Sequence, residues 1–146
     1  MNHQREPLSN SHASSQGQCG SSPPTRPTVI GLHHLKFAVS NPSISIAWYE
    51  RVLGARHITS LDHLDSTGTR FAAVCQVSCW GNILLELRQN AAQAAKDCCW
   101  DPVTMSIAGR EELLHWMAWL DHCGTAHSPA LVGVRGWILV FQVSLV

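Results

Sequence analysis

Histidines, cysteines and carboxylates are the side chains of this 146-residue chain that could bind a metal or move a proton, and it has nine, six and ten of them. The cysteines fit neither a zinc ribbon nor a thioredoxin-like pair, because no two are separated by two residues. Cys75 and Cys79 share one face of an expected strand, which is typical of small buried residues. The adjacent Cys98 and Cys99 lie in a connecting segment, where oxidation could reach them. The N-terminus has no continuous apolar stretch of the signal-peptide type, so we expect no disulfide framework.

His34 and Glu86 differ from the other polar residues because each sits in an otherwise apolar expected strand. In the strand 29–39, alternation places a leucine, a phenylalanine and a valine on one face and His34 on the other. In the strand 83–88, Glu86 lies opposite the apolar residues in the same way. An imidazole and a carboxylate together suit zinc, iron, manganese or nickel.

Glu86 needs a partner, because an unpaired carboxylate on a central strand is costly to bury. A metal ion is one such partner. Arg88 on the same face, or Lys36 on the first strand, is another, and either would satisfy the carboxylate without metal. The sequence leaves both interpretations open.

The elements that must position these residues follow in the order strand, helix and three strands. The helix after the strand 29–39 begins at Asn41 and Pro42, because Asn caps free N–H groups and Pro fits the first helical turn. It ends at Gly54. The rest of this half is expected to contain a strand at 57–61, a turn at 65–68, a strand at 71–79, a tight turn at 80–82 and the strand 83–88.

The same order begins again near residue 101. A strand is expected at 103–108 and an amphipathic helix at about 110–123, which Gly124 closes as Gly54 closes the first helix. Two more strands are expected at 127–132 and 137–146. The pattern is therefore βαβββ followed by βαββ.

Composition divides the chain into a tail and one domain. Residues 1–28 are rich in Ser, Pro, Gln, Gly and Asn and have almost no large apolar side chains, so we expect a disordered tail. The domain, 29–146, contains module one at 29–88, a polar and Ala-rich linker at 89–100 and module two at 101–146.

The chain resembles the vicinal oxygen chelate superfamily in the stretches GLHHLKFAVSNPSISIAWYERVLG, NILLELR and DPVTMSIAGREELLHWMAWLDHCGTAHSP. That superfamily contains glyoxalase I, fosfomycin and bleomycin resistance proteins, and extradiol dioxygenases. The resemblance covers about Val29 to Phe141 and rests on the positions of strands, helices and glycines. It implies an α+β fold of paired βαβββ modules whose mixed sheet forms a cup. In the family, a divalent metal in that cup usually binds two neighbouring oxygens of the substrate.

The resemblance also implies which residues would hold the metal. The family's positions on the first and fourth strands of module one match His34 and Glu86, and Glu86 would be a ligand or a displaced catalytic base. In module two, the first-strand position falls on Pro102, which offers no donor atom. The fourth-strand position would fall after residue 146, so we expect a second module that lacks its last strand.

Four other histidines are weaker candidates. His33 faces the opposite side of its strand from His34 and cannot simply replace it. For His57, His63 and His127, positions on the surface or in loops are expected.

Three functions remain open. The first is a lyase or dioxygenase of the glyoxalase type, which binds a small molecule in the cup and uses zinc, iron, manganese or nickel as a Lewis acid. The second is a metal-free small-molecule-binding protein, which Pro102 favours. The third is a truncated, inactive product of a longer enzyme, because Val143-Ser144 is what an unspliced intron donor would encode.

Composition excludes several partners. Ten basic residues balance ten acidic ones, so neither nucleic acid nor an anionic membrane surface is expected to bind. No apolar run approaches the about 20 residues of a membrane span, and we expect a cytoplasmic protein. A missing strand would leave 137–146 as an exposed hydrophobic sheet edge, which predicts aggregation or edge-to-edge dimerisation, a homodimer being one such assembly.

Overall fold

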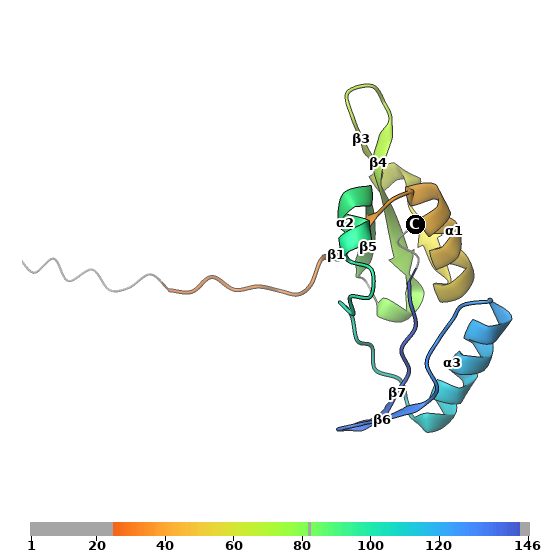
Figure 1. Cartoon of the computed structure of the whole chain (residues 1–146). Helices are drawn as coiled ribbons and strands as arrows, with labels where there is room; N and C mark the ends of the chain where they lie inside the picture. Colours follow the sequence, from red (N-terminus) through yellow and green to blue (C-terminus); the bar gives the residue numbers. More distant parts are fainter. Residues whose placement is uncertain (1–24, 82, 144–146) are drawn as a thin grey trace, which may run out of the picture. The chain divides into compact units, whose positions relative to one another are not determined.

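The computed structural model describes residues 25–81 and 83–143 (Figure 1). The chain divides into two units, residues 1–30 and residues 31–146. In the first unit, residues 25–30 form neither helix nor strand, and the rest of the tail predicted at 1–28 lies outside the described residues. Every element named below belongs to the second unit.

A mixed sheet is built around two central strands, β5 and β4. The strands are β1 (His34–Val39), β2 (Ala55–His57), β3 (His63–Leu64), β4 (Arg70–Val77) and β5 (Leu84–Gln89). Their order is β1-β5-β4-β2, and β3 also pairs with β4. β1 runs parallel to β5, whereas the other pairs are antiparallel. The helix α1 (Pro42–Leu53) follows β1, so the first module has the predicted βαβββ order, with the short β3 added.

The first helix begins and ends where local chemistry predicts. The side-chain oxygen of Asn41 accepts hydrogen bonds from the N–H groups of Ser43 and Ile44 at 3.0 and 3.3 Å, which satisfies donors that the first turn leaves free. Gly54 ends the helix with a φ of 62°, in the left-handed region that favours glycine.

The core lies between α1 and one face of the sheet. The helix buries Tyr49 and Val52, and the strands bury Leu85, Leu87 and Cys75, all at 0–1 % exposure. Because strand residues alternate between faces, the residues between these apolar positions face the other side of the sheet. That other side carries the polar side chains described in the next section.

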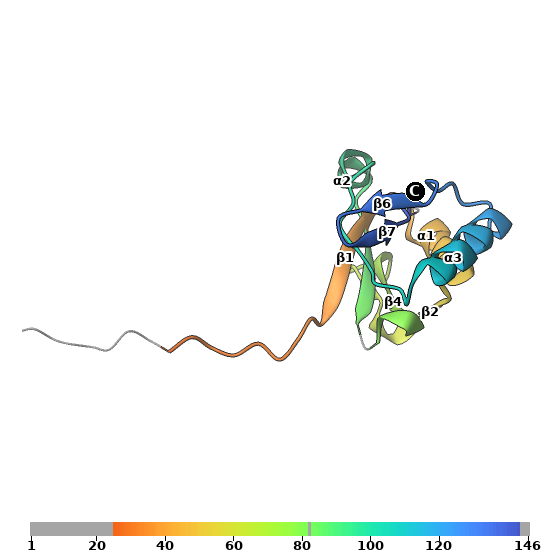
Figure 2. The ribbon, with the colours of Figure 1, turned by 90° about the horizontal axis from the view of Figure 1, so that it is seen from below.

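The second module contributes a helix and a hairpin. They are α3 (Arg110–His122), β6 (Leu131–Gly133) and β7 (Gly136–Ile138), and β6 and β7 form their own two-stranded sheet. α3 lies beside α1 in both views (Figure 1 and Figure 2). Trp119 of α3 donates a hydrogen bond from its indole N–H to the carbonyl oxygen of Val52 at 2.8 Å, and Leu120 is fully buried in the core.

Several predicted boundaries were wrong. The expected strand 103–108 is irregular, and Met105 and Ile107 are 43 % and 41 % exposed, because alternation forms no strand without a neighbour to pair with. The linker 89–100 contains a short helix, α2 (Ala91–Lys96), which Asn90 caps by accepting from the N–H of Gln93 at 3.0 Å.

Other strands are shorter than expected. β1 begins at His34, so residues 29–33 are not in a strand, and the strand expected at 57–61 ends at His57 and continues as a 3-10 turn. The strand expected at 127–132 forms at Leu131–Gly133, preceded by an isolated bridge between His127 and Phe141. Asn82 in the expected tight turn, and residues 144–146 of the expected last strand, lie outside the described residues.

The α+β fold class is confirmed, with one mixed sheet and a smaller second sheet. None of the helices formed by residues 25–81 and 83–143 has the length and hydrophobicity needed to cross a membrane.

Candidate functional site

On the side of the sheet opposite α1, polar residues lie in rows that cross neighbouring strands. The pairing register of the strands shows which residues share a row. Paired Cα positions place side chains on the same side of a sheet. One row joins Lys36 of β1, Glu86 of β5 and Val74 of β4, and the next joins Arg88 with Ala72 and His63. A third row runs from His34 through Leu84 and Gln76 to Arg56. We call this side the polar face, defined by His34, Lys36, Arg56, His63, Gln76, Glu86 and Arg88.

Glu86 is the centre of the polar face. Its side chain is 4 % exposed, and its two oxygens have different partners. Oε1 accepts a hydrogen bond from Nε of Arg88 at 2.8 Å and forms an ion pair with Nη2 of the same guanidinium, also at 2.8 Å. Oε2 lies 3.3 Å from Nζ of Lys36 and 3.5 Å from Nε2 of His34. The structure therefore brings the two predicted residues, His34 and Glu86, into contact, together with both cations that the sequence offered as alternatives.

The electrostatic balance at Glu86 favours its charged form. Burial raises the pKa of this carboxyl, but hydrogen bonds and charges from Arg88 and Lys36 outweigh burial, so the pKa falls below its usual value. The carboxylate is thus ionised at neutral pH and neutralised by protein cations.

Arg88 connects Glu86 to two aromatic rings. Its guanidinium lies 5.2 Å from the ring centroid of Phe71, a distance typical of a cation–π contact. Its Nη2 lies 3.4 Å from Nδ1 of His63. A guanidinium has no acceptor, so in this contact Arg88 is the donor and Nδ1 of His63 is the acceptor.

The other histidines considered from the sequence go to different places. His33 lies with its Nδ1 2.8 Å from Nδ1 of His34, next to the polar face although it is not in a strand. His63 reaches the polar face, 4.0 Å from Glu86. His127 instead contacts Asp121 at 3.2 Å and the carbonyl oxygen of Ser128 at 2.7 Å, outside the polar face.

Pro102 lies beside the polar face, in a small cavity. This cavity has a volume of about 150 Å³ and is lined by Lys36, Phe37, Ala38, Asp97, Trp100, Pro102 and Val143. The chain that follows α2 thus packs against β1, and Lys36 belongs both to the cavity and to the Glu86 cluster. The position that the resemblance matched to a second-module ligand is apolar here.

A second buried carboxylate, Asp62, was missed from the sequence. Its Oδ1 accepts from Nε2 of His57 at 2.8 Å and from the N–H of Val74 at 3.3 Å, and Oδ2 lies 3.3 Å from Arg70. Burial raises the pKa of Asp62, but these hydrogen bonds outweigh it and hold the pKa below its usual value. Arg70 also donates to Oγ of Ser43 at 2.8 Å. The two oxygens of this carboxylate join β2 to β4, and Arg70 extends the network to Ser43 of α1, so we interpret the network as structural.

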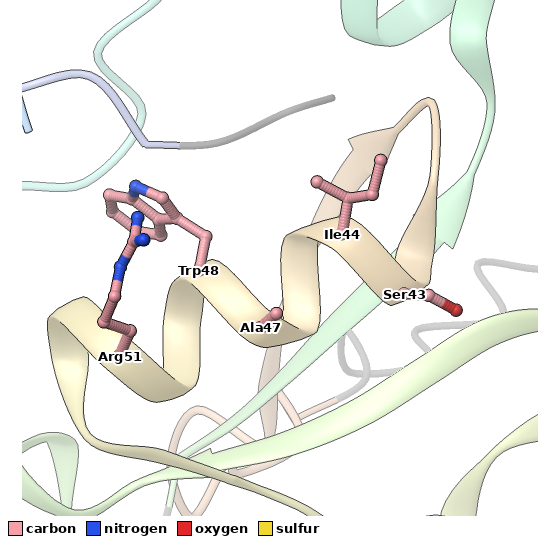
Figure 3. A pocket seen from close by; sticks show the side chains of 5 residues that line it. All are labelled: Ser43, Ile44, Ala47, Trp48 and Arg51. Atoms are coloured by element: carbon pink, nitrogen blue, oxygen red, sulfur yellow. The ribbon is translucent and has the colours of Figure 1, made fainter.

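A shallow hollow lies on the outer face of α1 (Figure 3). It has a volume of about 430 Å³ and is lined by Ser43, Ile44, Ala47, Trp48 and Arg51. All five residues come from one helix, and none belongs to the polar face. The hollow is larger than the cavity at Pro102 but brings no cluster of chemically active groups together.

The donors on the polar face fit a catalytic metal centre poorly. His34 and Glu86 supply two ligands, whereas catalytic zinc normally has three from the protein. Both oxygens of Glu86 already contact Arg88 and Lys36. Within residues 25–81 and 83–143, no group of three or more His, Cys, Asp or Glu side chains is arranged to hold a metal ion.

Comparison with known proteins supports the fold and leaves function open. No protein-family model matches the sequence, and no curated protein matches it. Solved structures do match.

A variant of the fosfomycin resistance protein FosX from Listeria monocytogenes, in complex with Mn(II) and 1S,2S-dihydroxypropylphosphonic acid, matches with a TM-score of 0.55 at 13% identity, over 80% of this chain and 86% of that chain. A glyoxylase/bleomycin resistance protein/dioxygenase domain from Frankia sp. EAN1pec matches with a TM-score of 0.55 at 18% identity, over 81% and 92%. FosX from Mesorhizobium loti matches with a TM-score of 0.51 at 14% identity, over 81% and 86%. The chain therefore has the vicinal oxygen chelate fold that its sequence resembles, and at these identities the likeness concerns the fold alone.

Proposed function

We propose that the polar face binds a small molecule and does so without a metal ion. The observation that supports this most is the neutralisation of Glu86 by Arg88 at 2.8 Å and Lys36 at 3.3 Å. A carboxylate that already has two cationic partners needs no metal to be stable in the sheet. The metal-free alternative drawn from Pro102 agrees with this arrangement.

Accessibility supports a ligand on this face. The side chains of His34, Lys36, His63 and Arg88 are between 36 % and 47 % exposed, although they surround a carboxylate that is almost fully buried. Polar groups held in place by one buried anchor, next to an apolar cavity, are typical of small-molecule sites. The structural neighbours include a FosX variant bound to a small phosphonic acid, which makes a small ligand a reasonable expectation for this fold.

The experiment is a nuclear magnetic resonance screen of the isotope-labelled chain after treatment with EDTA. A set of neutral, cationic and anionic aromatic fragments is titrated, and amide shifts are mapped on the chain. We expect at least one fragment to shift the signals of Lys36, Glu86 and Arg88 in the absence of metal. Fragments that shift nothing on the polar face, or that require added divalent metal to do so, would overturn the proposal.

A metal-dependent lyase or dioxygenase is the second candidate. In this proposal His34 and Glu86 hold a divalent ion, zinc, iron, manganese or nickel, and Glu86 is the catalytic residue. The supporting observation is the 3.5 Å between Nε2 of His34 and Oε2 of Glu86. The ion would have to displace Lys36 from the same oxygen. Metal analysis of the purified chain separates the candidates, because only the second predicts an ion that His34→Ala removes.

A further inference from the structure

The polar face carries more positive than negative charge. Among the strand residues that register places on it, Lys36, Arg56 and Arg88 are cations and Glu86 is an anion. Arg56 lies at the far end of the face, where it donates to Oε1 of Gln76 at 2.8 Å. The chain as a whole has a formal net charge of +0, so this surplus is a local property that composition hides. Such a face attracts anions.

The cations keep unused donors after they have neutralised Glu86. A guanidinium has five N–H donors, and Arg88 uses Nε and Nη2 on Glu86 and His63, so Nη1 has no hydrogen-bond partner within the described residues. An ammonium has three donors, and Lys36 directs one toward Glu86. Glu86 therefore fixes the two cations in place without exhausting them, which is the arrangement that an oxyanion ligand needs.

The cavity beside Lys36 supplies an apolar surface next to these donors. Phe37, Trp100 and Pro102 line it, and Trp100 is 71 % exposed. Asp97 also lines the cavity as a negative charge, and its Oδ1 accepts a hydrogen bond from Nε2 of Gln93 at 2.7 Å. An aromatic or aliphatic group could pack on Trp100 and Pro102 while an attached oxyanion reaches Lys36.

We infer that the ligand of the polar face is a small organic anion, with a carboxylate, phosphoryl or sulfonyl group held by Arg88 and Lys36 and an apolar group packed near Trp100. This inference rests on the proposed function and names its ligand class. Arg56 adds to the electrostatic attraction from a distance, and Glu86 is a positioning residue that holds Arg88 and Lys36 in place.

Isothermal titration calorimetry tests the inference by measuring the affinities of two matched probes. Benzenesulfonate keeps its negative charge across this pH range, and benzenesulfonamide has the same ring and a neutral head group. We expect the wild type to bind the sulfonate at least tenfold more tightly than the sulfonamide. This difference should disappear in Arg88→Met and in Lys36→Met. It should remain in the control Arg51→Met, which removes a cation from the outer face of α1. Glu86→Gln should bind the sulfonate more tightly, because it removes the competing carboxylate.

The outcomes distinguish the inference from the function on which it rests. Equal binding of the two probes, or a sulfonate affinity unchanged in Lys36→Met, overturns the inference while a neutral ligand on the polar face keeps the proposed function. If Arg88→Met does not fold, Lys36→Met decides, since that side chain is 47 % exposed at the sheet edge. Loss of sulfonate binding in Arg51→Met would place the anion on α1 and overturn the inference as well.

Discussion

The carboxylate of Glu86 divides its two oxygens between different cations. Arg88 holds Oε1 through two donors of its planar guanidinium, and Lys36 approaches Oε2 at 3.3 Å. A planar fork fixes the direction of the carboxylate more strongly than a flexible ammonium can. We therefore expect Arg88 to determine the position of Glu86, and Lys36 to contribute charge.

Glu86→Gln is expected to lower the free energy of unfolding by about 1–2 kcal/mol, because the amide leaves Arg88 and Lys36 without a counter-charge while both remain partly hydrated. Urea unfolding of the two chains at pH 7 measures the difference. The same variant should bind anions more tightly, so stability and affinity should change in opposite directions. A variant that is as stable as the wild type would show that Glu86 is no anchor for the cations.

Because its pKa is lowered in the folded chain, Asp62 is expected to make the folded state less stable at acidic pH. The pKa of Asp62 is lowered in the folded chain, since hydrogen bonds from His57, Val74 and Arg70 outweigh burial. A carboxyl whose folded pKa is depressed stabilises the fold above its unfolded pKa, about 3.9, and this contribution is lost as the pH falls through the folded value.

Asp62→Asn should therefore cost about 1–3 kcal/mol of unfolding free energy at pH 7, and the difference from the wild type should shrink below about pH 4. Denaturant unfolding at pH 7 and pH 3 measures it. Asp101→Asn, at an exposed position before Pro102, is the matched control and should change little at either pH. If Asp62→Asn lowers the unfolding free energy by the same amount at both pH values, the hydrogen bonds of Asp62 do not depend on its charge, which would contradict this prediction.

At the scale of elements, local signals predicted the helix α1 and failed for segments that depend on distant partners. Asn41 and Gly54 marked its ends correctly because capping involves residues within one turn. Asn90 is an equally local capping signal for α2, although the polar, Ala-rich composition of this stretch led to the prediction of a linker. The strand expected at 103–108 depended on a neighbour that the alternation of its own residues cannot supply.

Among the described residues, two hydrogen bonds connect α3 to α1 beside the shared core: Trp119 donates to the carbonyl oxygen of Val52 at 2.8 Å, and the thiol of Cys123 donates more weakly to that of Arg51 at 4.0 Å. Trp119→Phe removes the indole donor and leaves the carbonyl oxygen of Val52 without its 2.8 Å partner, so we expect a loss of about 1 kcal/mol in unfolding free energy. Trp100→Phe is the control, because Trp100 is 71 % exposed and should change stability by less than about 0.5 kcal/mol. Thermal unfolding followed by circular dichroism compares the two. Equal losses in both variants would mean that the hydrogen bond does not matter.

At the scale of the whole second unit, the sequence could predict which residues are polar on each strand but not which strands lie next to each other. Parity correctly placed His34 and Glu86 on the same side, where they lie 3.5 Å apart. Lys36 opposite Glu86, His63 beside Arg88 and Arg56 at the far end follow from strand register, which pairs residues far apart in the chain. The network of Asp62 could not be predicted for the same reason, because its partners lie on two different strands, β2 and β4.

The first module alone provides the charged groups of the polar face, and the segment after α2 adds the apolar cavity at Pro102. The vicinal oxygen chelate fold of this chain thus carries a charge arrangement in which Glu86 is the counter-ion of Arg88 and Lys36.

Equilibrium dialysis against manganese or zinc, followed by metal analysis of the retained protein, tests this claim most directly. We predict that the wild type and His34→Ala retain the same small amount of metal, because the oxygens of Glu86 are already bound by Arg88 and Lys36. One ion per chain in the wild type, lost in both His34→Ala and Glu86→Gln, would contradict the account and establish the metal-dependent alternative.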